Sequence, residues 1–157
     1  MNIEIWSVGK ANESFIEEGL QYYFKKTRPY VPVELVLLQL PKKVQTTDVQ
    51  RTKQLEEELI LKQLQPHHYL ILLDERGKQF DSVQWSQQFQ QLMNQGTKTL
   101  VILIGGAFGV SDAVRKQARQ CWSLSPLVFP HQLVRLIVAE QVYRSFSILN
   151  NSPYHHV

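Results

Sequence analysis

Two short stretches, residues 69–73 and 99–104, are apolar almost throughout. Continuous apolar runs of this length are typical of strands that are covered on both faces, as in parallel sheets. Neighbouring parallel strands require a crossover connection, which is usually a helix. These two runs therefore predict an α/β fold with a mostly parallel sheet.

The rest of the chain alternates between the same two periodicities. Further strands are expected at 3–8, 33–40 and 122–125, and helices at about 12–24, 47–65, 82–95, 111–120 and 131–149. Asn12, Ser82 and Ser111 stand where a helix N-cap would be. The chain has no internal repeat, low-complexity segment or interdomain linker, so we expect a single domain over residues 1–157.

Composition restricts the function only weakly. The net charge of +3 fits a nucleic-acid binder, but many basic proteins bind none. A single cysteine, Cys121, excludes an intrachain disulfide and a cysteine cluster for zinc. The sequence has no recognisable signal peptide and no apolar run long enough to span a bilayer. We expect a cytoplasmic protein that uses no metal and no membrane.

Three loops follow predicted strands, at residues 73–77, 105–109 and 124–129. Ligands of open α/β sheets bind beyond the carboxyl ends of the strands, so these loops are expected to meet in one pocket. The glycine-rich loop either lets a ligand approach the backbone or is only a tight turn, and it matches neither the P-loop nor the dinucleotide motif. Asp74, Glu75 and Arg76 form either a solvated turn with a local ion pair or a site that holds the loop or ligand.

The last helix, residues 131–149, is apolar over much of its circumference, which is typical of a helix in the core or at an interface. Arg135 and Arg144 would be costly to bury without partners, so they should reach carboxylates, such as Glu140, or phosphates. Other basic residues either lie on a solvated surface or contact RNA. They are Lys25, Lys26, Arg28, Lys42, Lys43, Arg115, Lys116 and Arg119. Arg115 and Arg119 are expected on one helix face.

Several segments together resemble one known family. They are residues 72–78 (LLDERGK), 103–109 (LIGGAFG), 123–125 (SLS), 131–135 (HQLVR), 140–144 (EQVYR) and 151–156 (NSPYHH). Each segment alone is moderately specific, but their order, spacing and terminal position are highly specific. By these segments the chain closely resembles, over its full length, the RlmH family of ribosomal large-subunit pseudouridine N3-methyltransferases, in the SPOUT superfamily.

The resemblance implies a SPOUT fold, that is, a mostly parallel sheet flanked by helices with a trefoil knot near the C-terminus. It also implies a homodimer with two S-adenosyl-L-methionine (SAM) pockets near its interface, and a ribosomal RNA substrate within an assembled ribosome or subunit. The residues that it implies for RNA binding or catalysis are Arg144, Tyr154 and His155. Those implied for SAM binding are Leu73, Gly105, Leu124, Ser125, Pro126, Leu127, Val128 and Phe129.

Methylation of N3 requires the loss of a weakly acidic imide proton. His155 could take that proton, Arg144 could stabilise the anion or hold a phosphate, and Tyr154 could stack on the base or orient it. The tail, residues 153–157, is expected to complete the partner's site, although it could instead pack on its own subunit. The alternatives are a SPOUT enzyme with another RNA target, such as a tRNA, or a non-enzymatic ribosome-binding module.

Overall fold

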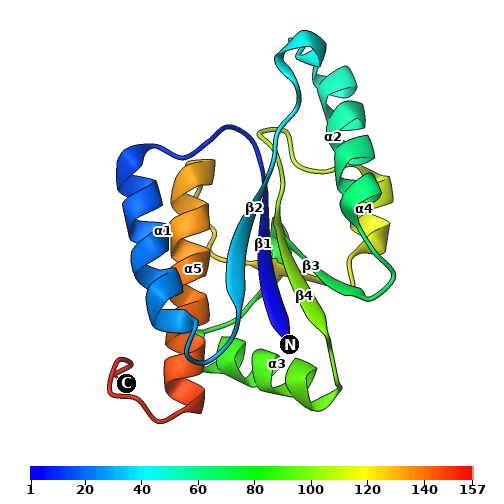
Figure 1. Cartoon of the computed structure of the whole chain (residues 1–157). Coiled ribbons are helices and arrows are strands. Elements are labelled where there is room, and N and C mark those ends of the chain that lie inside the picture. Colours follow the sequence, from blue (N-terminus) through cyan, green and yellow to red (C-terminus); the bar gives the residue numbers. More distant parts are fainter. Residues whose placement is uncertain (157) are drawn as a thin grey trace.

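The computed structural model describes residues 1–156, and it contains a five-stranded sheet in which every pairing is parallel. The strand order is β2-β1-β4-β3-β5 (Figure 1). The predicted parallel α/β architecture is therefore confirmed. The strands are β1 (Asn2–Val8), β2 (Val33–Leu38), β3 (His68–Gln79), β4 (Thr99–Ile104) and β5 (Gln120–Ser123).

Helices cover both faces of the sheet. The helices are α1 (Ser14–Thr27), α2 (Val49–Gln63), α3 (Ser82–Asn94), α4 (Asp112–Gln117) and α5 (His131–Leu149), with a 3-10 turn at Lys42–Val44. One core joins the sheet to α1, α3 and α5, and a second core joins its other face to α2 and α4. Because β4 lies at the centre, its six residues are all buried, as its apolar run predicts.

The structure differs from several local predictions about helix caps and helix faces. The N-cap of α3 is Asp81, which forms a capping box with Gln84, so the expectation that Ser82 caps this helix is wrong. Asn12 does not cap α1; its side chain instead binds Glu17 and accepts a hydrogen bond from Arg135. Ser111 does cap α4, but α4 ends at Gln117, so Arg115 and Arg119 do not share a helix face.

Strand β3 extends well beyond the apolar run and includes the charged residues 74–76. Its pairing with β5 is interrupted by a register shift between Leu73 and Lys78. Gly77 lies so close to β5 that a Cβ at this position would be 2.5 Å from the Trp122 carbonyl carbon. The three charges therefore lie on an irregular part of a strand rather than in a turn.

Helix α5 connects the two ends of the fold. It starts beside the carboxyl ends of the strands and runs to the opposite end, where the C-terminal segment folds back (Figure 1). A helix of 19 residues rises about 28 Å, so groups at its two ends are far apart in one chain. Among the described residues, no helix is both long enough and apolar enough to cross a membrane.

Candidate active site

A cavity of about 480 Å³ lies at the carboxyl ends of β3, β4 and β5, where the three loops were expected to meet. Residues from all three loops line it, and Phe129, His131 and Val134 complete the wall on the side of α5. Seven of the eight residues expected to bind SAM line the cavity: Leu73, Gly105, Leu124, Ser125, Leu127, Val128 and Phe129. Pro126 is the exception.

The glycine-rich loop is both a tight turn and a cavity wall. The Gly109 N–H donates to the Gly106 carbonyl at 3.0 Å, and Gly109 has a φ of +77°, which favours glycine. A Cβ on Gly105 would lie 2.8 Å from Val110 Cγ1, and one on Gly106 would clash with the Glu56 carboxylate. The loop therefore brings its backbone close to the cavity because it has no side chains at these positions.

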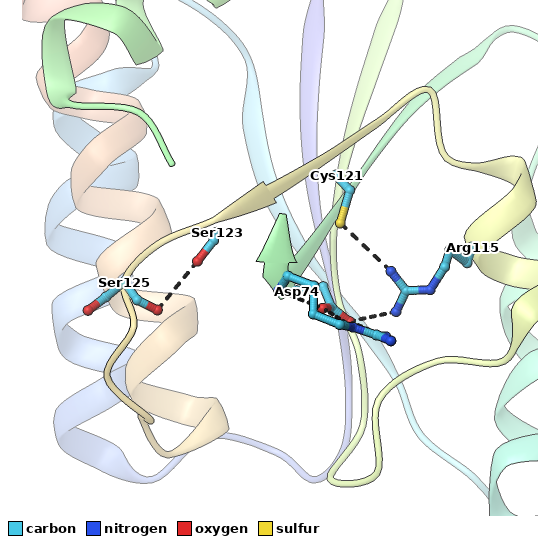
Figure 2. A network of polar contacts seen from close by, with 6 residues as sticks. Asp74, Arg115, Cys121, Ser123 and Ser125 are labelled. Carbon is cyan, nitrogen blue, oxygen red and sulfur yellow. Dashed lines mark hydrogen bonds and ion pairs between the residues drawn. The ribbon is translucent and has the colours of Figure 1, made fainter. Parts of the chain in front are cut away.

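Asp74 fixes the other side of the cavity through two arginines (Figure 2). Arg76 donates to it from its backbone N–H at 2.9 Å and from Nε at 3.0 Å, and Arg115 Nη2 donates at 2.6 Å. The hydrogen bonds from Arg76 and then Arg115 hold the pKa of Asp74 well below its usual range, although burial acts against them. Arg115 also lies 3.9 Å from Cys121 Sγ. Asp74 thus makes the local ion pair and also connects β3 to α4.

The loop after β5 is held by serines and presents apolar side chains outward. Ser123 Oγ donates to the Ser125 carbonyl at 3.4 Å (Figure 2). Ser125 Oγ accepts from the Leu127 N–H at 3.0 Å. Leu127 and Val128 are 70% and 88% exposed although they line the cavity. At the start of α5, burial lowers the pKa of His131, while a backbone contact with Gly105 opposes that shift.

The three residues expected to act on RNA form a separate cluster around Glu140. Arg144 donates to Glu140 Oε1 from Nε at 2.9 Å and from Nη2 at 2.5 Å, and Tyr154 donates its hydroxyl to the same oxygen at 3.0 Å. His155 Nδ1 lies 3.2 Å from Arg144 Nη1. Burial and then contacts with Tyr23 and Glu140 raise the pKa of Tyr154, so its phenol stays neutral. The expectation that Arg144 reaches Glu140 is confirmed.

This cluster, which we call the Glu140 cluster, does not line the cavity of the same chain. His131 lies at the cavity and Arg144 lies 13 positions later on α5, which corresponds to a rise of about 20 Å. The tail packs on its own α5, with the Tyr154 ring 4.6 Å from that of Tyr143. Val157, the last residue of the predicted trans-acting tail, lies outside the described residues. One chain therefore carries both sets of residues but does not bring them together.

Sequence reasoning missed other residues at this end of the fold. Glu56, from the middle of α2, reaches the glycine loop, and its sequence context of three consecutive glutamates gave no signal. Arg135 is buried, but its hydrogen-bond partners are Ser7, Asn12 and a backbone carbonyl, so the expectation of a carboxylate partner is wrong. Within residues 1–156, no three histidine, cysteine or acidic side chains gather as a metal site would require.

Comparison with known proteins gives the class of this fold and site. Residues 1–155 match a family model described as a predicted SPOUT methyltransferase. The fold is similar to that of a probable methyltransferase from Bordetella pertussis, with a TM-score of 0.57, 12% identity, and coverage of 92% of this chain and 94% of that chain. A probable methylase family protein from Haemophilus influenzae gives a TM-score of 0.55 at 12% identity, covering 96% of this chain and 66% of that one. The chain belongs to the SPOUT methyltransferases.

Relatives with higher identity narrow the assignment. The chain is 44% identical to a protein of Flavobacterium psychrophilum, 43% to one of Pelobacter propionicus and 42% to one of Parabacteroides distasonis, each over 99% of this chain and at least 99% of the relative. All three carry the name ribosomal RNA large subunit methyltransferase H. The chain belongs to this family, whose methyl donor is SAM.

The cavity fits SAM in its chemistry. Its volume lies in the range of small-molecule sites, and apolar side chains from the loop after β5 offer cover for an adenine ring. The side-chain-free backbone at Gly105 and Gly106 offers polar groups at close approach. Leu73 and Gly105 lie side by side, because Leu73 pairs with Ile104 in the β3–β4 ladder.

Proposed function

We propose that this chain is a methyltransferase that methylates N3 of a pseudouridine in large-subunit ribosomal RNA. Two observations support the proposal: three loops converge on one cavity that fits SAM, and the match to the large-subunit methyltransferase family covers almost the whole chain. A SAM molecule held there supplies an electrophilic methyl group. The protein must then position the nucleophile and accommodate the loss of its proton.

The proposed SAM-binding residues are those expected from the sequence. Leu73 and Leu124 provide apolar contact, and Gly105 provides close backbone approach. Ser125 orders the loop through its contact with the Leu127 N–H, and Asp74 fixes β3 from outside. Pro126 belongs to the same loop and shapes its course. The complete set is Leu73, Gly105, Leu124, Ser125, Pro126, Leu127, Val128 and Phe129.

The Glu140 cluster is proposed to act on the RNA. Arg144 offers a guanidinium to a developing anion or a phosphate, because one side of it is fixed by Glu140. The Tyr154 ring is held against Arg144, with the guanidinium carbon 4.8 Å from the ring centre, so it can present a face to a base. His155 offers an imidazole next to both.

A second copy of the chain supplies what one chain lacks. Since the Glu140 cluster is about 20 Å along α5 from the cavity, we propose a homodimer in which the cluster of one chain completes the cavity of the other. The apolar side chain of Phe108, which lines the cavity and is 51% exposed, supports an interface there. Light scattering should give about twice the mass of one chain, and an active monomer would contradict this.

The finer features of the resemblance remain part of this proposal. Residues 1–157 act as one SPOUT methyltransferase domain, with the trefoil knot near the C-terminus that the resemblance implies. The proposed substrate is the RNA within an assembled ribosome or subunit, in the cytoplasm, as the resemblance to the family implies. An experimental structure of the full dimer would establish or exclude the knot.

The direct test uses ribosomes from a strain that lacks the activity. Incubated with the protein and isotopically labelled SAM, they should gain one methyl group on N3 of one large-subunit pseudouridine, as mapped by mass spectrometry. Naked large-subunit RNA and tRNA serve as comparison substrates. Methylation of tRNA alone, or of no RNA, would contradict the proposal.

A further inference from the structure

A second cavity, of about 650 Å³, lies directly beside the first and shares Gly106, Ala107 and His131 with it. Its other walls come from the loop after β1, the start of α1, the middle of α2 and the start of α5. The loops after β1 and after β4 both lie at the upper edge of the sheet in Figure 1. Segments 103–109 and 131–135 contribute to its lining, but the three loops expected to meet in one pocket do not account for this second cavity.

One wall of the second cavity holds a buried guanidinium. Arg135 is 1% exposed, and its Nε donates to Ser7 Oγ at 2.7 Å. Its Nη1 donates to the Lys10 carbonyl and to Asn12 Oδ1, both at 2.8 Å. Within residues 1–156, Arg135 has no carboxylate partner and its Nη2 makes no hydrogen bond. A buried charge that lacks a counter-charge is costly, so a ligand oxygen at Nη2 would be strongly favoured.

The same cavity is also lined by a carboxylate. Glu56 reaches from α2 to the backbone of Gly106, which separates the two cavities, and it makes no ion pair or hydrogen bond with any of residues 1–156. The side chain is half-buried, and burial raises the pKa of its carboxyl group. A hydrogen-bond donor and a hydrogen-bond acceptor thus face one space without pairing with each other.

This pair complements the edge of a uracil-type base. The edge presents an acidic N3–H donor beside carbonyl acceptors, which one carboxylate and one N–H donor can match. Guanine offers a similar pair at N1–H and O6, and the proposed function selects the uracil-type base. Phe15 and Leu133 add apolar surface against which a base extruded from its helix could stack. A phosphate would satisfy Arg135 but would be repelled by Glu56.

We propose that the second cavity receives the target base, with Glu56 accepting the N3–H and Arg135 Nη2 donating to a neighbouring carbonyl. This inference rests on the proposed function. The N3 proton passes to the Glu56 carboxylate before methyl transfer, because the methyl carbon must approach N3 along the direction that the N–H bond occupies. The electron pair left on N3 then forms the new bond to the methyl carbon. The carbon–sulfur bond of the donor breaks, and its electron pair stays on sulfur. Glu56 is then the proton acceptor, and His155 of the partner chain is not required for that step.

The test compares wild type, Glu56→Gln and the matched control Glu58→Gln, an exposed glutamate on the same helix. Calorimetry measures SAM affinity without RNA. Carbodiimide modification measures whether N3 of the target base is protected in the complex of protein, S-adenosylhomocysteine and unmethylated ribosomes. Quench-flow measures the single-turnover methylation rate. The glutamine can still accept the N3–H through its amide oxygen, but it cannot take up the proton.

Glu58→Gln should match wild type in all three measurements. Glu56→Gln should keep SAM affinity within about twofold and keep the protection of N3, while the single-turnover rate falls by about 10²-fold or more. A rate within about threefold of the control would overturn the proposal, and so would an N3 left unprotected by wild type. A parallel loss of SAM affinity would also overturn it, because Glu56 would then support the cofactor pocket. If wild type methylates no ribosomal RNA, the proposed function fails as well.

Discussion

The two ends of helix α5 differ in what they lack. At its start, His131 lies beside two adjoining cavities but none of the Glu140 cluster is near. At its end, Arg144, Tyr154 and His155 are mutually ordered around Glu140, but they line neither cavity. The comparison supports the proposal that one chain carries two half-sites, which a second copy of the chain joins.

The largest effect should come from removing the charge at the end of α5. Arg144→Gln is expected to lower the methylation rate by about 10³-fold, because the guanidinium faces charge that develops on the RNA. SAM affinity should stay within about twofold, because none of the proposed SAM-binding residues belongs to the Glu140 cluster. Single-turnover rates and calorimetry measure the two effects.

The control for this variant is Arg51→Gln, an exposed arginine on α2 whose side chain contacts only Gln54 by hydrogen bond. It should leave both the methylation rate and the SAM affinity unchanged. If Arg144→Gln weakened SAM binding as much as it slowed transfer, the two ends of α5 would not be functionally distinct.

A substitution at the cavity should have the opposite effect, weakening SAM binding while leaving the Glu140 cluster intact. Gly105→Val places a branched side chain against Val110 and into the space lined by the glycine loop. SAM affinity should fall by about 10²-fold, which corresponds to about 2.7 kcal/mol. The oligomeric state and the arrangement of the Glu140 cluster should be unaffected. Calorimetry and light scattering test this, and unchanged SAM affinity would remove the cavity as the SAM site.

A smaller effect on stability is expected where Asp74 ties β3 to α4. Asp74→Asn should lower the free energy of unfolding by about 1–3 kcal/mol at pH 7, because two arginines lose their charged partner. The arginines lower the pKa of folded Asp74 below its unfolded value, so its contribution is present above the unfolded pKa, near 4. That contribution is lost as the pH falls through the folded pKa.

The difference between wild type and Asp74→Asn should therefore shrink below about pH 4 and vanish in stronger acid. Urea unfolding at a series of pH values measures it, with exposed Glu75→Gln as the control. A difference that is constant with pH would show that the ion pairs are not its cause.

The smallest effect should appear in the salt dependence of RNA binding. Lys25 and Lys26 lie in the last turn of α1, and Lys26 lies 5.6 Å from the centre of the Tyr143 ring. If they contact phosphates beside the Glu140 cluster, each change to glutamine should reduce the slope of log affinity against log salt by about one. Lys62→Gln, on the opposite face of the sheet, should leave the slope unchanged. Slopes equal to that of wild type would place the RNA elsewhere.

The charge pattern predicted this surface only partly. Arg115 and Arg119 were one possible RNA-binding face, but the guanidinium of Arg115 binds Asp74, 41 residues earlier in the sequence. Such a long-range pairing leaves no mark in local sequence. Lys25 and Lys26 remain available because they are adjacent to no acidic side chain at salt-bridge distance in residues 1–156.

The sequence predicted the sheet and the first cavity for the same reason. Continuous apolar runs identify buried strands, and the carboxyl ends of parallel strands necessarily share an edge, so local signals at residues 73, 105 and 124 imply one site. The second cavity was not predictable in this way. Glu56 comes from the middle of a polar helix, and only the packing of α2 over the sheet brings it to Gly106.

The predictions of two helix caps and of the partner of buried Arg135 were wrong for a different reason. Asp81 and Ser82 are both good N-caps, and the reciprocal contact with Gln84 decides in favour of Asp81. Asn12 was a plausible cap of α1, but its oxygen is used by Arg135, which lies 123 residues later in the sequence. Where two partners compete for one polar group, the tertiary structure determines the outcome.

The most direct test of the shared site is a mixed dimer. One chain carries Gly105→Val, with a blocked cavity and an intact tail, and the other lacks residues 153–157, with an intact cavity and no tail. Each variant alone should be inactive. If the Glu140 cluster acts across the dimer, the mixed dimer has one complete site, and its methylation rate per dimer should be about half that of wild type. If the tail serves its own chain, both sites in the mixed dimer are defective, and a mixed dimer as inactive as its parents would contradict the account.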